Sequence, residues 1–191
     1  MIENKLEIKY YGNPVLGKVS SKVNTITKEI RNLAAEMIEA MHRYDGIGLA
    51  APQVGQNLNL VVINLSPEYL NDPSISPGEA LFLPQMPITL INPEIMSLTS
   101  EKSTAEEGCL SVPEIYAPVT RPTGIALKAQ MLSGETINID CGGFLARVIL
   151  HEVDHLKGKL FIERLEPKNY KKIIKKLDKL KKHLAKKGFI N

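Results

Sequence analysis

The chain has 191 residues, of which 43% are apolar and 24% are charged. These proportions are typical of one folded globular domain and exclude an intrinsically disordered chain. Only 5% of the residues are aromatic and tryptophan is absent, which argues against a stacking platform for single-stranded nucleic acid.

The N-terminus and the cysteine content indicate the compartment. The first seven residues are charged and lack the apolar core of a secretory signal, and no apolar run approaches the ~18 residues that span a membrane. With no signal, a disulfide between Cys109 and Cys141 is not expected. We therefore expect a cytoplasmic protein with neither a membrane partner nor a DNA partner.

The first half of the chain predicts one helix followed by strands. Apolar residues recur every three or four positions over 27–46, which predicts a helix that a threonine begins and a glycine ends. An irregular, glycine-bounded segment follows at 46–55, and then a strand at 58–64. Five prolines predict a long surface loop at 66–87, after which 88–95 is again typical of a strand.

The second half predicts a hairpin and two helices. Residues 125–131 and 136–141 flank a short turn and are typical of a β-hairpin, whereas 144–156 and the stretch from Asn169 show helical spacing. Strands therefore dominate the middle of the chain and helices its ends. This distribution predicts an α+β fold and not alternating β-α-β units.

The strongest chemical signal is the sequence His-Glu-Val-Asp-His at 151–155. Residues four apart on a helix lie on the same face, so His151 and His155 can converge on one metal ion. Glu152, beside the first histidine, can act as a general base toward water at that ion. Two of the four histidines fall in this segment, which disfavours an amphipathic helix with surface histidines.

A catalytic metal site needs a third protein ligand and an open position. One class of metalloprotease takes that ligand from a histidine at the place where this chain has Phe161, and another takes a glutamate from a later helix, but no glutamate follows position 168. Cys109 follows a glycine that permits a tight turn, and its thiolate would complete a His₂Cys set. An inert buried thiol is the alternative, and it is the one we expect for Cys141.

Three segments together resemble the peptide deformylase family. They are Gly-Ile-Gly-Leu-Ala-Ala-Pro-Gln-Val-Gly at 46–55, Glu-Gly-Cys-Leu-Ser at 107–111 and His-Glu-Val-Asp-His-Leu at 151–156, in the order and approximate spacing of that family. The similarity extends over nearly the whole chain, including 92–94 and 143–147. It implies an α+β fold in which antiparallel or mixed sheets surround a central metal-binding helix, with an N-terminal helix and a basic C-terminal helix.

The resemblance implies removal of the formyl group from the N-terminal formyl-methionine of nascent polypeptides, with release of formate. Glu152 matches the family's catalytic carboxylate. The Gln53 amide and the Leu110 backbone N–H match the groups that stabilise charge on the formyl oxygen, although a loop-stabilising hydrogen bond is an alternative for Gln53. The family points to Fe²⁺, for which Zn²⁺, Ni²⁺ or Co²⁺ can substitute, and its metal ligands match three residues: Cys109, His151 and His155.

The family binds its peptide in an extended form, which implies a substrate-binding set and a supporting ion pair. Val148 and Ile149 have helix core as an alternative role. Arg121 matches an arginine that pairs with the acid of the metal motif, here Asp154, and holds the metal helix in place. The implied substrate-binding residues are Ile47, Gly48, Glu107, Gly108, Val148 and Ile149.

The chain departs from the family at two places. Leu150 stands where many members have glutamine, which removes no ligand and no catalytic group, so we expect activity to be retained. The proline-rich stretch at 66–87 is longer than in compact members and could shape the cleft or an interface.

The C-terminal end differs in charge from the rest of the chain. Residues 168–191 carry ten lysines and one aspartate, whereas residues 1–167 have a net charge of −6. We expect 1–167 to form the catalytic domain and 168–191 a basic helix that extends it. That helix either docks on the domain with solvated lysines or contacts ribosomal RNA phosphates.

Two functions compete with the one that the resemblance implies. The first is a general metallopeptidase, and the second is a catalytically silent ribosome-binding relative.

Overall fold

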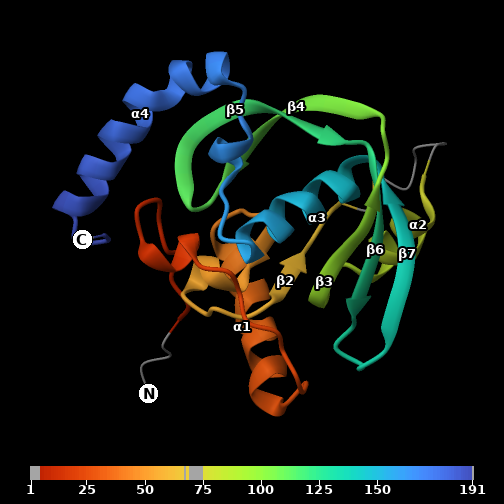
Figure 1. Cartoon of the computed structure of the whole chain (residues 1–191). Helices are drawn as coiled ribbons and strands as arrows, with labels where there is room; N and C mark the ends of the chain where they lie inside the picture. Colours follow the sequence, from red (N-terminus) through yellow and green to blue (C-terminus); the bar gives the residue numbers. More distant parts are fainter. Residues whose placement is uncertain (1–4, 67, 69–74, 191) are drawn as a thin grey trace.

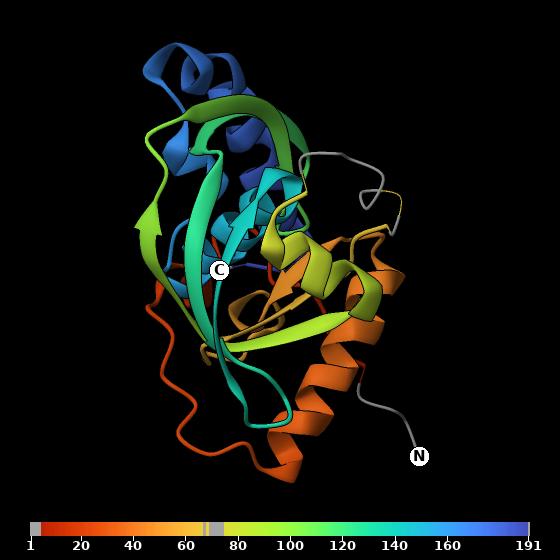
Figure 2. The ribbon, with the colours of Figure 1, turned by 90° about the vertical axis from the view of Figure 1, so that its right-hand side faces the viewer.

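The strands arch around one central helix, α3 (Gly143–Leu156), in the computed structural model, which describes residues 5–66, 68 and 75–190 (Figures 1 and 2). The helix contacts strands of both sheets, and most of its residues are buried. The arrangement places α3 where side chains from several strands can reach it.

All neighbouring strands of the described chain are antiparallel. The smaller sheet pairs β4 (Lys102–Cys109) with β5 (Val112–Pro122). The larger sheet has the order β1-β2-β3-β6-β7. Its strands are β1 (Gly48–Ala50), β2 (Leu60–Ile63), β3 (Ile88–Leu98), β6 (Gly124–Gln130) and β7 (Thr136–Gly142). The α+β class predicted from the sequence is confirmed.

The first helix, α1 (Lys28–Arg43), packs its apolar face onto β1 and β2. Ala34, Met37, Ala40 and Met41 are fully buried there, as the three- and four-residue spacing predicts. The following segment is more regular than expected, because β1 and the 3-10 helix η2 (Ala51–Val54) occupy most of it. The short 3-10 helix η1 (Pro14–Gly17) precedes α1.

The expectation of an irregular loop at 66–87 is wrong over its second part. Helix α2 (Pro77–Phe82) and the 3-10 helix η4 (Leu83–Gln85) lie there, whereas 67 and 69–74 lie outside the described residues. Pro77 stands in the first turn, where the missing N–H costs nothing. Ser76 Oγ accepts the Glu79 N–H at 3.4 Å and Glu79 Oε2 accepts the Ser76 N–H at 3.0 Å, so each residue caps the other.

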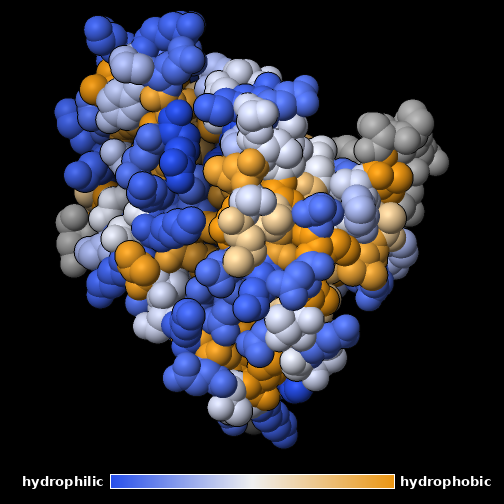
Figure 3. Space-filling view, turned by 45° about the vertical axis from the view of Figure 1, so that its right-hand side comes forward, coloured by the Kyte–Doolittle hydropathy of each residue, from blue (hydrophilic) through white to orange (hydrophobic). Residues whose placement is uncertain are grey.

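The last helix, α4 (Pro167–Lys186), docks on β5 through its apolar stripe. Ile173 and Leu177 are buried with residues of β5 and of the 3-10 helix η5 (Phe161–Arg164). Its lysines face outward, and the upper left of Figure 3, where α4 lies, is mostly hydrophilic. The helix therefore docks on the domain, which is one of the two alternatives that the sequence leaves open. No helix in the described part of the chain has both the length and the apolar character that a bilayer crossing requires.

Candidate metal centre and its cavity

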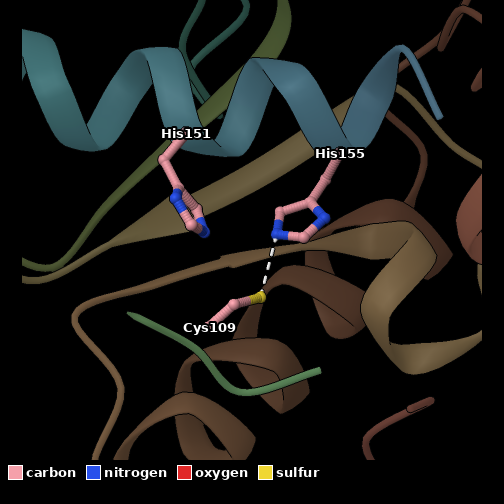
Figure 4. A group of neighbouring side chains, drawn as sticks. All are labelled: Cys109, His151 and His155. Atoms are coloured by element: carbon pink, nitrogen blue, oxygen red, sulfur yellow. Dashed lines mark hydrogen bonds between the residues drawn. The ribbon is translucent and has the colours of Figure 1, made fainter. Parts of the chain in front are cut away.

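Three side chains from distant segments meet below α3. Cys109 ends β4, and His151 and His155 lie one turn apart on the helix, with both rings directed toward the sulfur (Figure 4). One ligand atom from each residue lies within 4.8 Å of the others, and Cys109 Sγ lies 3.3 Å from His155 Nε2. One thiolate and two imidazoles are a donor set that suits Zn²⁺, Fe²⁺ and similar ions.

The surrounding polar atoms fit a divalent cation at this point. His151 Nδ1 lies 3.0 Å from Glu107 Oε2, which leaves the other ring nitrogen for a metal. Glu152 Oε2 is buried and has no hydrogen-bond partner in the described part of the chain. Buried polar atoms rarely stay unpaired, so this oxygen indicates that another polar group belongs in the site.

Glu107 is the centre of a buried charge network. Its carboxylate accepts hydrogen bonds from Arg121 Nε and Nη2 at 2.7 and 2.9 Å, and from Arg147 Nη1 at 2.8 Å. Burial alone would raise the pKa of the Glu107 carboxyl, but the hydrogen bonds from His151 and Arg121 outweigh burial and lower the pKa to about 2. Glu107 therefore stays ionised beside His151, a candidate metal ligand.

Asp154, the aspartate of the 151–155 motif, joins the same network from α3. Arg121 Nη1 donates to Asp154 Oδ2 at 2.9 Å, which is the pair expected from the resemblance. Arg164 Nε also donates to Asp154 Oδ2, at 3.0 Å, and its Nη2 contacts Oδ1. Arg121 thus bridges the β4 carboxylate of Glu107 and the α3 carboxylate of Asp154, and so fixes the strand against the helix.

Burial strongly shifts the acid-base properties of the motif. Burial raises the pKa of the Glu152 carboxyl to about 7, although the charges of His151 and Arg121 act in the opposite direction. Burial alone would lower the pKa of His151, but hydrogen bonds with Cys109 and Glu107 outweigh it and raise the pKa to about 10. Burial lowers the pKa of His155 well below its usual range.

A cavity of about 530 Å³ opens onto these residues. Ile149 does not line it, which corrects its expected place in the substrate pocket. On α3, Val148 and Glu152 face the cavity, whereas the fully buried Ile149 is turned into the hydrophobic core. Of the other expected residues, His155, Arg121 and Asp154 do not line the cavity, and ten do: Ile47, Gly48, Gln53, Glu107, Gly108, Cys109, Leu110, Val148, His151 and Glu152.

The side chain of Gln53 is held in one orientation at the inner end of this cavity. Its Oε1 accepts the Ala50 N–H at 2.8 Å. Its Nε2 then points toward the candidate metal ligands, 3.2 Å from Ser111 Oγ and 3.4 Å from Cys109 Sγ. The amide N–H groups therefore face the space beside the sulfur.

Several residues of the site were not predicted from the sequence. Arg147 fixes Glu107 and also donates to Ser103 O and to Val119 O, at 2.9 and 3.1 Å. Phe161 stacks on His151 with ring centroids 6.1 Å apart. Arg147 lies one helical turn before His151, so its place on the same helix face as His151 was a usable signal. No sequence signal indicated the contacts of Phe161 or Arg164.

Comparisons with known proteins identify the family of the chain. The model of the polypeptide deformylase family matches residues 5–171. A peptide deformylase of Acinetobacter baumannii is 39% identical over 175 residues, which cover 92% of this chain and 91% of that protein. A plant peptide deformylase structure has a TM-score of 0.83 and 33% identity, covering 100% of this chain and 97% of that one. The structure of peptide deformylase from Thermotoga maritima has a TM-score of 0.73 and 37% identity, covering 86% of this chain and 100% of that one. The chain therefore belongs to the polypeptide deformylase family.

Proposed function

We propose that this hydrolase removes the formyl group from the N-terminal formyl-methionine of nascent polypeptides and releases formate. The observation that carries the proposal is the convergence of Cys109, His151 and His155 beside Glu152, whose Oε2 has no hydrogen-bond partner among the described residues. Cys109, His151 and Glu152 all line one cavity. The family is one of peptide deformylases, and its reaction is hydrolysis of a formyl amide.

Cys109, His151 and His155 are the proposed ligands of one divalent ion. Fe²⁺ is the proposed ion, with Zn²⁺, Ni²⁺ or Co²⁺ able to substitute, because the set combines one soft thiolate with two imidazoles. When bound, such an ion supplies Lewis acidity and makes hydroxide available near neutral pH. An iron–thiolate site is also sensitive to oxygen, so metal content and activity are best measured on anaerobically prepared enzyme.

Glu152 is the proposed general base and acid. Glu152 is 4% exposed, lines the cavity and directly follows the proposed ligand His151 in the chain. It would take a proton from the attacking water and later deliver a proton to the amine that leaves as the free methionine N-terminus. Because its second oxygen has no partner in the described chain, the carboxylate is free to make these contacts.

Gln53 and Leu110 are the proposed donors to the formyl oxygen. The Gln53 amide is preoriented by Ala50, and Leu110 follows directly after the proposed cysteine ligand. Fixed N–H groups stabilise the charge that develops on the oxygen without reorganising during the reaction. Arg121 and Asp154 act indirectly, because they hold β4 against α3 and so keep the cysteine near the histidines.

The substrate would lie along the outer part of the cavity. Ile47, Gly48 and Gly108 offer backbone on two sides, and Val148 offers an apolar wall for the methionine side chain. The competing functions lack this support: neither protease ligand is available, and a catalytically silent relative would not need Glu152 aimed into the cavity. Casein cleavage compared with formate release separates a general peptidase from a deformylase.

The decisive experiment replaces Glu152 with glutamine in the iron-loaded enzyme. Formate release from formyl-Met-Ala-Ser should fall by at least ~10³-fold while bound iron per chain stays near that of the wild type, because the ligands are untouched. Undiminished formate release would contradict the role of Glu152. Absence of formate release by the wild type would contradict the function itself.

We also propose that 168–191 is a basic extension of the catalytic domain 1–167 that contacts ribosomal RNA in the cytoplasm. The lysines of α4 face outward while its apolar stripe supports β5, so deleting the helix would expose core. Charge reversal is the cleaner test. The variant Lys175→Glu/Lys179→Glu/Lys182→Glu should lose salt-sensitive co-sedimentation with ribosomes, and unchanged co-sedimentation at low salt would contradict the proposal.

A further inference from the structure

The segment that precedes η1 connects two parts of the active site through its backbone. The Lys9 N–H donates to Gln53 O and the Tyr11 N–H donates to Ser111 O, each at 2.7 Å. Inside the site, Gln53 Nε2 in turn donates to Ser111 Oγ at 3.2 Å. The segment therefore holds η2, which carries the proposed donor to the formyl oxygen, against the turn that follows the proposed ligand Cys109.

The residues that follow α4 pack on this same segment, so that the two ends of the described chain meet (Figure 1, blue beside red). The ring of Phe189 meets the ring of Tyr10 edge-on, with centroids 5.3 Å apart and an angle of 70° between the planes. Ile190 is 6% exposed and packs against Gly12. Both contacts fall on the few residues whose backbone reaches the active site.

Gly12 makes the close contact with Ile190 possible. Its φ of 102° lies in the left-handed region that favours glycine, and a Cβ there would lie 2.7 Å from Ile190 Cδ1. The turn is closed by the Asn13 N–H, which donates to Tyr10 O at 2.9 Å. Segments outside the last element of a fold fray unless side chains fasten them, and here two apolar side chains do so.

We infer that Phe189 and Ile190 are positioning residues, which hold the segment 9–12 in place and through it fix the Gln53 amide beside Cys109. The inference rests on the proposed deformylase function, in which Gln53 is a proposed donor to the formyl oxygen. Such a donor stabilises developing charge best when its orientation is fixed before the reaction. Neither Phe189 nor Ile190 lines the cavity, so both act on the site only through the segment.

Hydrogen exchange followed by mass spectrometry tests the contact without any measurement of activity. In the variant Phe189→Ala/Ile190→Ala, peptides that cover 9–12 should exchange at least ~10-fold faster than in the wild type, because the two donor N–H groups lose protection when the segment opens. The conservative variant Phe189→Tyr/Ile190→Val keeps a ring and a branched side chain and should exchange at the wild-type rate. Ile174→Ala, which trims a 39% exposed apolar side chain of α4, is the matched control.

Kinetics of the iron-loaded enzyme with formyl-Met-Ala-Ser test the consequence for the site. At equal iron content, Phe189→Ala/Ile190→Ala should lower kcat by about tenfold and change KM by less than twofold, because a displaced donor is missed mainly in the transition state. The conservative variant and Ile174→Ala should keep the wild-type kcat. Phe189 is 48% exposed, so Phe189→Ala alone should fold, and it should shift exchange and kcat in the same directions by a smaller amount.

Two outcomes would overturn the positioning role alone. The first is wild-type exchange over 9–12 in the double alanine variant, and the second is faster exchange combined with a wild-type kcat. Both leave the deformylase function intact, because the wild type still releases formate. Absence of formate release by the iron-loaded wild type would instead overturn the proposed function and the catalytic part of this inference, whereas the exchange rates would still show whether Phe189 and Ile190 hold the segment.

Discussion

Glu107 Oε2 lies 3.0 Å from Nδ1 of His151, so a carboxylate from the smaller sheet orients a proposed metal ligand on α3. The same carboxylate accepts a hydrogen bond from Arg121, whose guanidinium also donates to Asp154 on the next turn of α3. Glu107 therefore both orients His151 and, through Arg121, attaches β4 to α3. Glu107 is 7% exposed, so its charge is compensated by these partners and not by water.

Replacing Glu107 with glutamine should weaken both metal binding and folding. The substitution removes the negative charge that compensates the buried Arg121 and Arg147. Removing one partner of such a buried network lowers the free energy of unfolding by about 3 kcal/mol or more. Loss of the carboxylate beside His151 should also reduce metal affinity by about 10- to 100-fold. Urea unfolding and competition with a chelator measure the two effects. Glu135→Gln, an exposed change in the β6–β7 hairpin, is the control and should alter neither.

The stability that Glu107 provides should disappear in acid. Its pKa is lowered to about 2 in the folded chain from the usual 4.5, so the folded state favours the ionised form. The contribution is therefore complete above pH 4.5 and is lost as the pH falls toward 2, and its full size is about 3 kcal/mol. Urea unfolding of metal-free wild type and Glu107→Gln should give curves whose difference shrinks between pH 5 and pH 2. A difference that stays constant over this range would contradict the assignment.

The two cysteines should react very differently. Burial raises the pKa of the Cys141 thiol to about 12, with the charges of Glu79 and Asp140 acting in the same direction, and the residue is 2% exposed. Iodoacetamide at pH 8 should therefore label metal-free enzyme at Cys109 and label Cys141 only after unfolding. Bound metal should protect Cys109. Mass spectrometry of the labelled peptides measures this, and early labelling of Cys141 in folded Cys109→Ser would contradict it.

The elements with strong periodicity were predictable from the sequence. The buried faces of α1 and α4 and the hairpin β6–β7 follow local spacing, which sequence carries directly. The β4–β5 pair was missed for a physical reason. Strand β4 reads Lys-Ser-Thr-Ala-Glu-Glu-Gly-Cys and is exposed over most of its length, so it has no apolar alternation, and β5 contains prolines that argue against a strand. Pairing between β4 and β5 therefore stabilises an extended conformation that the local sequence does not favour.

The same distinction applies to the site. The spacing of His151 and His155 on a helix is local and was sufficient to predict that they converge. The partner of the histidine ring was not local. Glu107 was expected only as a substrate-pocket residue, and it does line the cavity, but its carboxylate also contacts His151, Arg121 and Arg147. Three arginines and two acids can pair in many ways, and only the packing of β4 and β5 on α3 decides which pairs form.

Gly48 offers a direct test of how closely the active site is packed. A Cβ at this position would lie 2.4 Å from Glu152 Oε1 and 2.9 Å from its Cδ, so alanine there must displace the proposed catalytic carboxylate. A displacement of about 1 Å can cost 10²-fold in rate, and Gly48→Ala should lower kcat for formyl-Met-Ala-Ser by about that factor while iron content is kept. Gly17→Ala is the matched control, because a Cβ there meets no atom within 4 Å. Wild-type kcat in folded, iron-loaded Gly48→Ala would show that Glu152 does not act from the position seen here.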